Sequence, residues 1–192
     1  MTDLRLGGYQ FQGVCRIVPE QRAEGIPTEY LPQSEYNNVH NHPLNEYGCG
    51  PFCKFNIPKG INEEGVYALL VNDKLRYIGK CDRLSPRWNA GYGNISPRNC
   101  FVHGQSTNCR LNNLILRAYK VNSTIDLYFH KTSNSSEIEA YLIEQLAPEW
   151  NIQKVAQPYK TKKTKEQTIR NSRNSSILSY VKHSLDLLLC RR

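Results

Sequence analysis

Two tyrosines and an arginine recur at intervals of ten in the segment GVYALLVNDKLRYIGKCDRLSPR, at Tyr67, Tyr77 and Arg87. The runs VYALLV and LRYIG resemble strands, and Asn72 and Asp73 between them tolerate the left-handed backbone of a tight turn. The segment therefore predicts a β-hairpin with one tyrosine on each strand. A buried tyrosine hydroxyl must find a partner, so Val, Ile or Phe would suit a purely structural hairpin better. The hydroxyls are candidates for chemistry.

A carboxylate stands in an unexpected place on a later helix. The run SSEIEAYLIEQLA, followed by Pro148, predicts a helix. A turn of about 100° per residue puts Glu139 inside the apolar arc, whereas Glu137 and Glu144 fall on the opposite side. A core-facing carboxylate must be paired, bound to a metal or shifted in pKa. The alternative is a capping box with Ser136, in which Glu139 reaches back to the first amide of the helix.

Other segments supply the elements around these residues. DRLSPRWNAG after the hairpin predicts a helical turn, and STNCRLNNLILRAYK predicts a helix with Ser106 or Thr107 as its cap. TIDLYF alternates and predicts a third strand. The region before residue 65 is rich in Gly, Pro, Asn and Tyr and predicts short strands and loops. The order β-β-α-α-β-α predicts an α+β domain, a small sheet with helices packed on it.

The charge is concentrated at one end of the chain. The 192 residues carry a net charge of +8, and residues 154–192 hold ten basic against two acidic residues. This segment reads as a basic linker and an amphipathic helix. Such a concentration suits a polyanionic partner; the alternative is a tail that serves solubility. We therefore divide the chain into an N-terminal extension at 1–64, a core at 65–153 and a basic C-terminal segment at 154–192.

Several classes of protein fit the sequence poorly. No apolar run is long enough to span a membrane, and the first residues lack the apolar core of a signal peptide, so we expect a soluble cytoplasmic protein.

The seven cysteines are an odd, scattered set that favours reduced thiols. His40, His42, Cys49 and Cys53 have zinc-ligand chemistry, but their spacing matches no standard finger. A loop with small buried thiols is the simpler interpretation.

The functional candidates together resemble the GIY-YIG nuclease superfamily. GVY at 65–67 and YIG at 77–79 stand for its two signatures, Arg87 for its helix arginine and Glu139 for its metal-binding glutamate. The run PEWN resembles its closing motif and supplies Asn151. The resemblance covers roughly residues 65–151. Some restriction enzymes of the superfamily carry a histidine where this chain has Gly91; others use a lysine near the second tyrosine, where Lys80 stands.

The resemblance implies a three-stranded antiparallel sheet flanked by helices and metal-dependent hydrolysis of DNA phosphodiesters. Tyr67 is then the expected general base, and Tyr77 positions water or shares the proton. A tyrosine with a pKa near 10 needs a nearby cation to act at neutral pH, and Lys80 or the metal would supply it. Arg87 would bind the scissile phosphate. Glu139 would hold one Mg²⁺, for which Mn²⁺ can substitute.

Asn151 would orient a phosphate oxygen or fix Tyr77. His103 is a distant further candidate for a catalytic residue, although it is more typical of a loop.

The expected partner is double-stranded DNA, and we expect the extension at 1–64 to recognise DNA or pack on the core. Backbone contacts are expected from the polar face of the helix at 106–120 and from the basic segment, namely Arg110, Asn113, Arg117, Lys120, Lys160, Lys162, Lys163 and Lys165.

The short flanks favour a compact, sequence-specific type II restriction endonuclease. The alternatives are a homing or mobile-element nuclease, a structure-specific repair nuclease, or a DNA-binding protein with a silent nuclease fold. A palindromic target would call for a two-fold dimer. The amphipathic helix near the C-terminus could pack on the core or pair two subunits.

Overall fold

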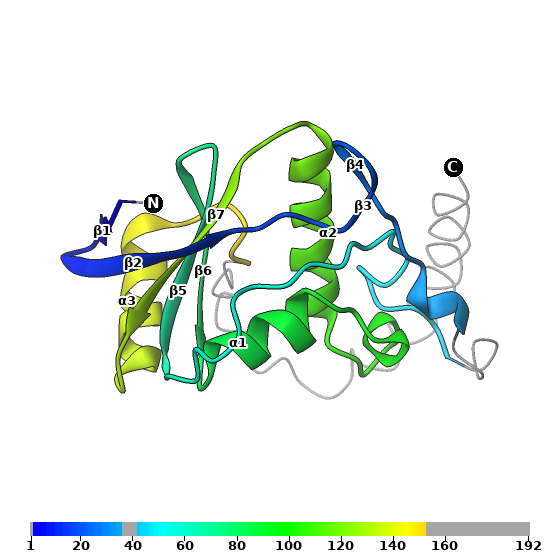
Figure 1. The fold of residues 1–192 in the computed structure, drawn as a ribbon. Coiled ribbons are helices and arrows are strands. Elements are labelled where there is room, and N and C mark those ends of the chain that lie inside the picture. The colour runs from blue at the N-terminus through cyan, green and yellow to red at the C-terminus, as the bar shows by residue number, and fades with distance from the viewer. Residues whose placement is uncertain (1, 36–41, 153–192) are drawn as a thin grey trace, which may run out of the picture. The chain divides into compact units, whose positions relative to one another are not determined.

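The computed structural model describes residues 2–35 and 42–152 (Figure 1). These residues belong to one compact unit that extends to Ile152. The amphipathic helix predicted near the C-terminus, the four lysines at 160–165 and His40 lie outside the described residues.

A five-stranded antiparallel sheet organises the unit, which has a mixed α/β fold. The three predicted strands lie side by side as β7, β5 and β6, and two strands from the N-terminal extension continue the sheet beyond β7. The expected three-stranded sheet is therefore too small. The sheet order is β1 (Leu4–Leu6), β2 (Tyr9–Arg16), β7 (Ile125–Lys131), β5 (Gly65–Val71) and β6 (Lys74–Cys81).

The hairpin that joins β5 and β6 forms as the sequence predicts. Asn72 and Asp73 take positive φ angles of 48° and 61°, as a two-residue turn between twisted strands requires. The register pairs Tyr67 with Gly79 and Leu69 with Tyr77. Because side chains alternate along a strand, Tyr67 and Tyr77 emerge on the same face of the sheet.

Helices cover both faces of the sheet (Figure 1). On one face, α3 (Ser135–Leu146) buries Ile138 and Leu142 against the apolar side chains of β5 and β6. On the other, α2 (Ser106–Lys120) contributes Leu111 and Ile115 to the larger core, which also holds both tyrosines. The short helix α1 (Leu84–Pro86) runs directly into a π-helical segment, Arg87–Tyr92, which confirms the predicted helical turn after the hairpin.

The predicted helix caps are wrong, although the helices themselves are confirmed. Asn134 precedes α3 and Gln105 precedes α2, and neither makes a side-chain capping hydrogen bond. Ser136 and Ser106 lie inside the first turns. The hydroxyl of Ser136 instead accepts a hydrogen bond from Lys80.

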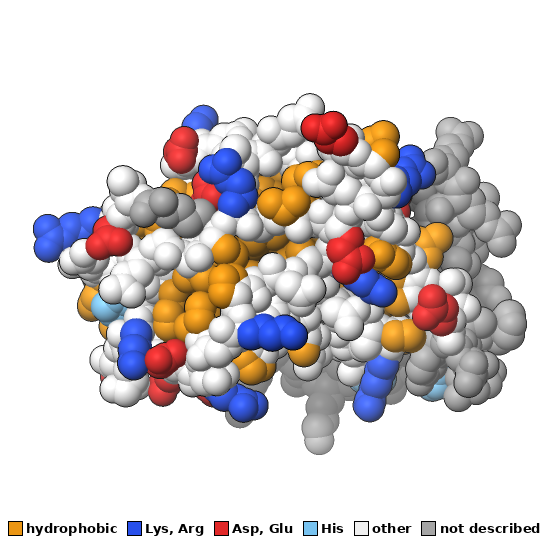
Figure 2. All heavy atoms as spheres, in the orientation of Figure 1, with side chains coloured by type: hydrophobic (Ala, Val, Ile, Leu, Met, Phe, Trp, Pro, Cys, Tyr) orange, Lys and Arg blue, Asp and Glu red, His pale blue; other side chains and the backbone are white. Residues whose placement is uncertain are grey.

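The N-terminal extension is part of the compact unit. Beyond β2 it forms the small hairpin of β3 (Gln21–Ala23) and β4 (Ile26–Pro27) and a 3₁₀ turn at Pro32–Glu35. A second 3₁₀ turn, Pro97–Cys100, precedes α2. On the face drawn in Figure 2, basic and acidic side chains are interspersed and no large area has a single charge. None of the described helices is long and apolar enough to cross a membrane.

Candidate active site

Tyr67 lies at the centre of the site, and its position depends on the glycine opposite. Its side chain is only 1% exposed. A Cβ added to Gly79 would stand 2.5 Å from the Tyr67 hydroxyl oxygen and 2.6 Å from Cζ. The ring therefore crosses the bare backbone of β6, which explains why a glycine follows Tyr77 and Ile78.

Tyr92 joins Tyr67 to Arg87. The hydroxyls of Tyr67 and Tyr92 lie 2.8 Å apart, and Arg87 Nη2 donates a 2.6 Å hydrogen bond to the Tyr92 hydroxyl. The guanidinium carbon also lies 4.2 Å from the centroid of the Tyr92 ring. A π-helical segment pairs residues i and i+5, and this spacing brings Arg87 and Tyr92 together. Tyr92 was not among the candidate residues predicted from the sequence.

Tyr77 completes the cluster of hydroxyls. Its ring stacks on Tyr67, with centroids 6.3 Å apart and planes inclined by 30°. The Tyr77 hydroxyl interacts with Tyr92, and the charges of Arg87 and Glu139 both act on it. At 8% exposed, Tyr77 is closer to solvent than Tyr67.

Glu139 reaches the site although α3 packs on the opposite face of the sheet. β6 is the edge strand, and the half-buried carboxylate meets the backbone of Lys80 there. Burial raises the pKa of Glu139, while the backbone hydrogen bond from Lys80 and the charges of Lys80 and Arg87 oppose that rise. The capping-box alternative is wrong, because the carboxylate faces β6 and not the first turn of α3.

Arg87 is the cation that faces the tyrosines, which differs from the expectation for Lys80. The exposed ammonium of Lys80 donates a 2.7 Å hydrogen bond to Ser136. The pKa values of Tyr67 and Tyr77 are both raised, chiefly by burial, and the positive charge of Arg87 acts against that rise. In the resting site both tyrosines are therefore neutral at pH 7.

Asn151 is fully engaged with the backbone of the strand that carries Tyr77. Its Oδ1 accepts a 2.9 Å hydrogen bond from the amide of Ile78, and its Nδ2 donates a 2.7 Å bond to the carbonyl of the same residue. The adjacent amide of Trp150 donates to the carbonyl of Arg76. The closing motif thus covers part of the free edge of β6 and holds it next to Tyr77.

The polar face of α2 is largely used inside the protein. Arg110 donates to the carbonyl of Trp150, and Asn113 donates a 3.0 Å hydrogen bond to the carbonyl of Pro51. Lys120 forms a 2.6 Å ion pair with Glu29. Of the four residues expected to contact DNA from this helix, Arg117 is exposed without a hydrogen bond or ion pair to the described part of the chain.

Two of the candidate zinc ligands, Cys49 and Cys53, make local contacts. Cys53 is buried, and its amide donates to the Oδ1 of Asn112 at 2.9 Å. The Cys49 thiol lies 3.7 Å from the carbonyl of Gly50. His103 is exposed in a turn with a φ of 68°. Among residues 2–35 and 42–152, no group of three or more His, Cys, Asp or Glu side chains could hold a metal ion.

Comparison with solved structures finds a mutant of bacteriophage T4 EndoII, at 25% sequence identity and a TM-score of 0.37. The match covers 58% of this chain and 86% of that one. No protein-family model matches the sequence, and no curated protein matches it. A TM-score this low carries no weight for function.

Proposed function

We propose that the chain is a metal-dependent endodeoxyribonuclease that hydrolyses phosphodiester bonds of double-stranded DNA. The observation that carries the proposal is the convergence of Tyr67, Tyr77, Arg87 and Glu139. They come from two strands, the π-helical segment and α3, yet they act on one another through hydrogen bonds and charges. A structural core has no need for a half-buried arginine and a carboxylate beside three buried tyrosines.

Arg87 is suited to bind the scissile phosphate. A guanidinium has five donors, and the hydrogen bond to Tyr92 uses one of them. The others can engage phosphate oxygens in the forked geometry that arginine favours. Tyr92 fixes the guanidinium from one side, so we assign it the role of positioning Arg87 and the hydroxyl of Tyr67.

Glu139 is the proposed ligand of Mg²⁺, or of Mn²⁺ in its place. The donor set fits, because Mg²⁺ is commonly held by one or two carboxylates and takes its other ligands from water and substrate phosphate. When bound, the ion supplies Lewis-acid polarisation of the phosphate and helps the leaving oxygen. Glu139 is half buried, and burial raises its pKa; a carboxylate in such a place is stabilised by a cation that pairs with it.

Tyr67 is the proposed general base, with Tyr77 positioning the attacking water or sharing the proton. Because burial raises the pKa of both, neither is a base in the resting site. The base form must be stabilised by positive charge, and Arg87 is the side chain placed to do so. Proton loss from this buried network is then the step that limits activity at low pH.

We propose that the enzyme is a compact, sequence-specific restriction endonuclease of type II. The N-terminal extension supports this reading, since it is built into the compact unit and its strands β1 and β2 continue the sheet. The basic segment at 154–192 is proposed to grip the DNA backbone, together with Arg117. A homing, mobile-element or repair nuclease is the second candidate. A palindromic target would be cut by a two-fold dimer.

Incubation of the purified protein with phage DNA and Mg²⁺ tests the proposal. Discrete fragments that disappear when EDTA is added would support a sequence-specific enzyme. A smear or nicked circles would favour the second candidate. DNA that stays intact with both Mg²⁺ and Mn²⁺ would contradict nuclease activity.

A further inference from the structure

Two buried thiols lie together where α2 begins. Cys100 ends the 3₁₀ turn Pro97–Cys100, Cys109 lies near the start of α2, and both side chains are fully buried. The Cys109 sulfur lies 3.2 Å from the carbonyl oxygen of Asn99, the residue that precedes Cys100. The two thiols are also hydrogen-bonded to each other. Both are free, so the pair is a dithiol.

The hydrogen bond between the two thiols makes them differ in reactivity. It lowers the pKa of Cys109, and a hydrogen bond from Asn45 adds to that effect, although burial opposes it. The same bond, together with burial, raises the pKa of Cys100. Because the thiolate is the nucleophilic form of cysteine, Cys109 is the thiol that reacts first, and Cys100 keeps its proton.

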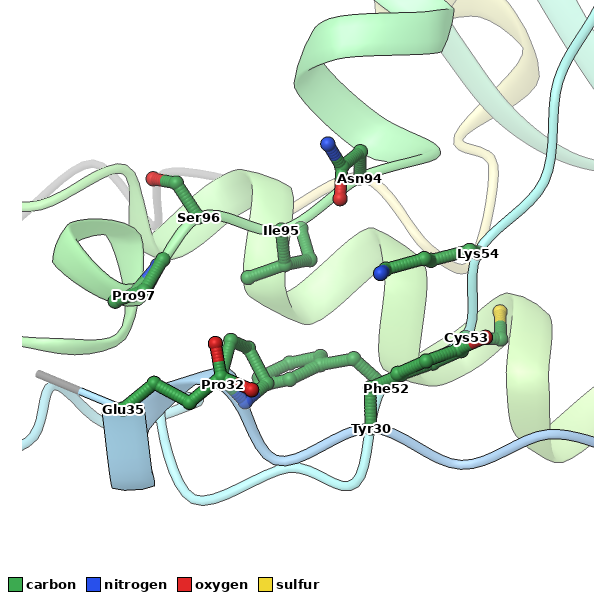
Figure 3. Close-up of a pocket in the computed structure, with 10 residues that line it drawn as sticks. All are labelled: Tyr30, Pro32, Glu35, Phe52, Cys53, Lys54, Asn94, Ile95, Ser96 and Pro97. Atoms are coloured by element: carbon green, nitrogen blue, oxygen red, sulfur yellow. The ribbon is translucent and has the colours of Figure 1, made fainter.

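A cavity of about 210 Å³ gives small molecules a route towards this pair (Figure 3). Phe52 and Ile95 line the cavity and belong to the same apolar cluster as both thiols. Ser96 also lines it, and the carbonyl oxygen of Ser96 lies 3.8 Å from the Cys100 sulfur. A single residue of the chain thus separates the cavity from the Cys100 thiol.

The size and lining of the cavity favour a small, neutral oxidant. Its volume is below the roughly 300–1,000 Å³ of pockets that enclose drug-sized ligands, but it exceeds several times the roughly 30 Å³ that one water molecule occupies in the liquid. The charged groups in its lining are Glu35 and Lys54, which have opposite signs. Hydrogen peroxide carries no charge and is only slightly larger than water, so it can enter.

We propose that Cys100 and Cys109 form a modification site that hydrogen peroxide oxidises to a reversible disulfide. The Cys109 thiolate attacks one oxygen of the peroxide, the O–O bond breaks, and hydroxide leaves a sulfenic acid on Cys109. Cys100 then gives up its proton, its sulfur bonds to the Cys109 sulfur, and the S–O bond breaks. The two thiols lose two electrons and two protons, and the peroxide is reduced to two water molecules.

The disulfide would join the 3₁₀ turn to the helix that supports the catalytic segment. The fully buried side chain of Asn112, on α2, donates a 2.7 Å hydrogen bond to the carbonyl of Tyr92. A cross-link stabilises a fold mainly by restricting the unfolded chain. Oxidation of the pair would therefore reinforce this support without changing a side chain of the candidate active site.

Peptide mapping of the peroxide-treated protein tests the proposal. Trypsin places both cysteines on one peptide, residues 99–110, which contains no other cysteine. The folded protein is treated with hydrogen peroxide, alkylated in urea, digested and analysed by mass spectrometry. We expect this peptide to lose two hydrogen atoms and take up no alkyl group, and dithiothreitol to restore both alkylation sites. Its oxidation should be at least about tenfold faster than that of Cys81, whose pKa burial raises to about 12.

Serine variants separate the two roles. With Cys100→Ser, the serine hydroxyl can still donate to Cys109, and dimedone should trap the sulfenic acid there. With Cys109→Ser, Cys100 should stay reduced at the same peroxide dose. Cys81→Ser is the matched control and should form the disulfide like the wild type.

Three results would overturn the proposal: a 99–110 peptide that keeps both alkyl groups while other cysteines are oxidised, a link from Cys100 to Cys49 in its place, or a disulfide that forms only in urea. The wild-type measurement does not depend on whether a variant folds. It also contains neither metal nor DNA, so its outcome is independent of the nuclease proposal.

Discussion

Replacing Gly79 with alanine tests whether the bare backbone of β6 positions Tyr67. The new Cβ would lie 2.5 Å from the Tyr67 hydroxyl oxygen, about 0.9 Å short of ordinary contact at 3.4 Å. Tyr67 has no free space to yield, because its ring is edge-on to Trp88 at 5.3 Å and to Tyr92 at 6.2 Å. The ring must shift by nearly this amount, or the hairpin must open.

Two effects of Gly79→Ala follow from this shift. Overpacking a core costs about 1–3 kcal/mol, partly offset by the lower entropy of the unfolded alanine chain, so we expect a net loss of about 1–2 kcal/mol in the free energy of unfolding. A misplacement near 1 Å in a catalytic group costs on the order of 100-fold in rate. Urea denaturation and single-turnover cleavage of a DNA duplex measure the two effects.

Gly91→Ala is the matched control. A Cβ there would meet its three nearest atoms at 3.6, 3.7 and 3.9 Å, which are ordinary contacts with Arg87 and Asn108. The residue is helical, so alanine should raise stability by about 0.5–1 kcal/mol and leave the cleavage rate within a few-fold. If Gly79→Ala behaves like Gly91→Ala in both assays, the close approach of Tyr67 to β6 has no functional role.

Three further predictions address the closing motif, the proposed base and the basic segment. Asn151→Ala removes two hydrogen bonds to Ile78 and should lower the free energy of unfolding by about 2 kcal/mol, whereas the exposed Asn62→Ala should stay within about 0.5 kcal/mol in the same denaturation. Because the raised pKa of Tyr67 keeps it protonated at neutral pH, the cleavage rate should rise about tenfold per pH unit from about pH 6 to 9; a flat profile would exclude a tyrosine base. Changing the four lysines at 160–165 to glutamine should flatten the slope of log K against log salt by up to about 3–4 units, and an unchanged slope in a filter-binding series would mark the segment as a solubility device.

The elements with strong periodicity were predictable from sequence. The hairpin of β5 and β6, the helices α2 and α3 and the strand β7 all carry regular apolar patterns, and the structure confirms each of them. β1 and β2 were missed as part of the sheet. In β2 only Phe11 is fully buried, and its pairing with β7 joins residues more than 100 positions apart. Local patterning holds little information about such a long-range pairing.

At the site, the residue types were predictable and their connections were not. The inward position of Glu139 follows from helix periodicity, but its contact with the edge of β6 depends on how α3 crosses the sheet. Tyr92 was missed because its pairing with Arg87 needs a π-helical segment, and no regular 3.6-residue pattern signals one. The spacing of five between a tyrosine and the motif arginine is the one signal that could have found it.

Cleavage by Glu139→Gln compared with Glu144→Gln is the most direct test of the central claim. Both residues lie on α3, but Glu139 interacts electrostatically with Tyr77 and Arg87, whereas Glu144 is exposed on the helix. The account predicts that Glu139→Gln loses Mg²⁺-dependent cleavage while it still folds and still retards a DNA duplex in a gel, and that Glu144→Gln cuts like the wild type. Near-normal cleavage by Glu139→Gln would contradict it.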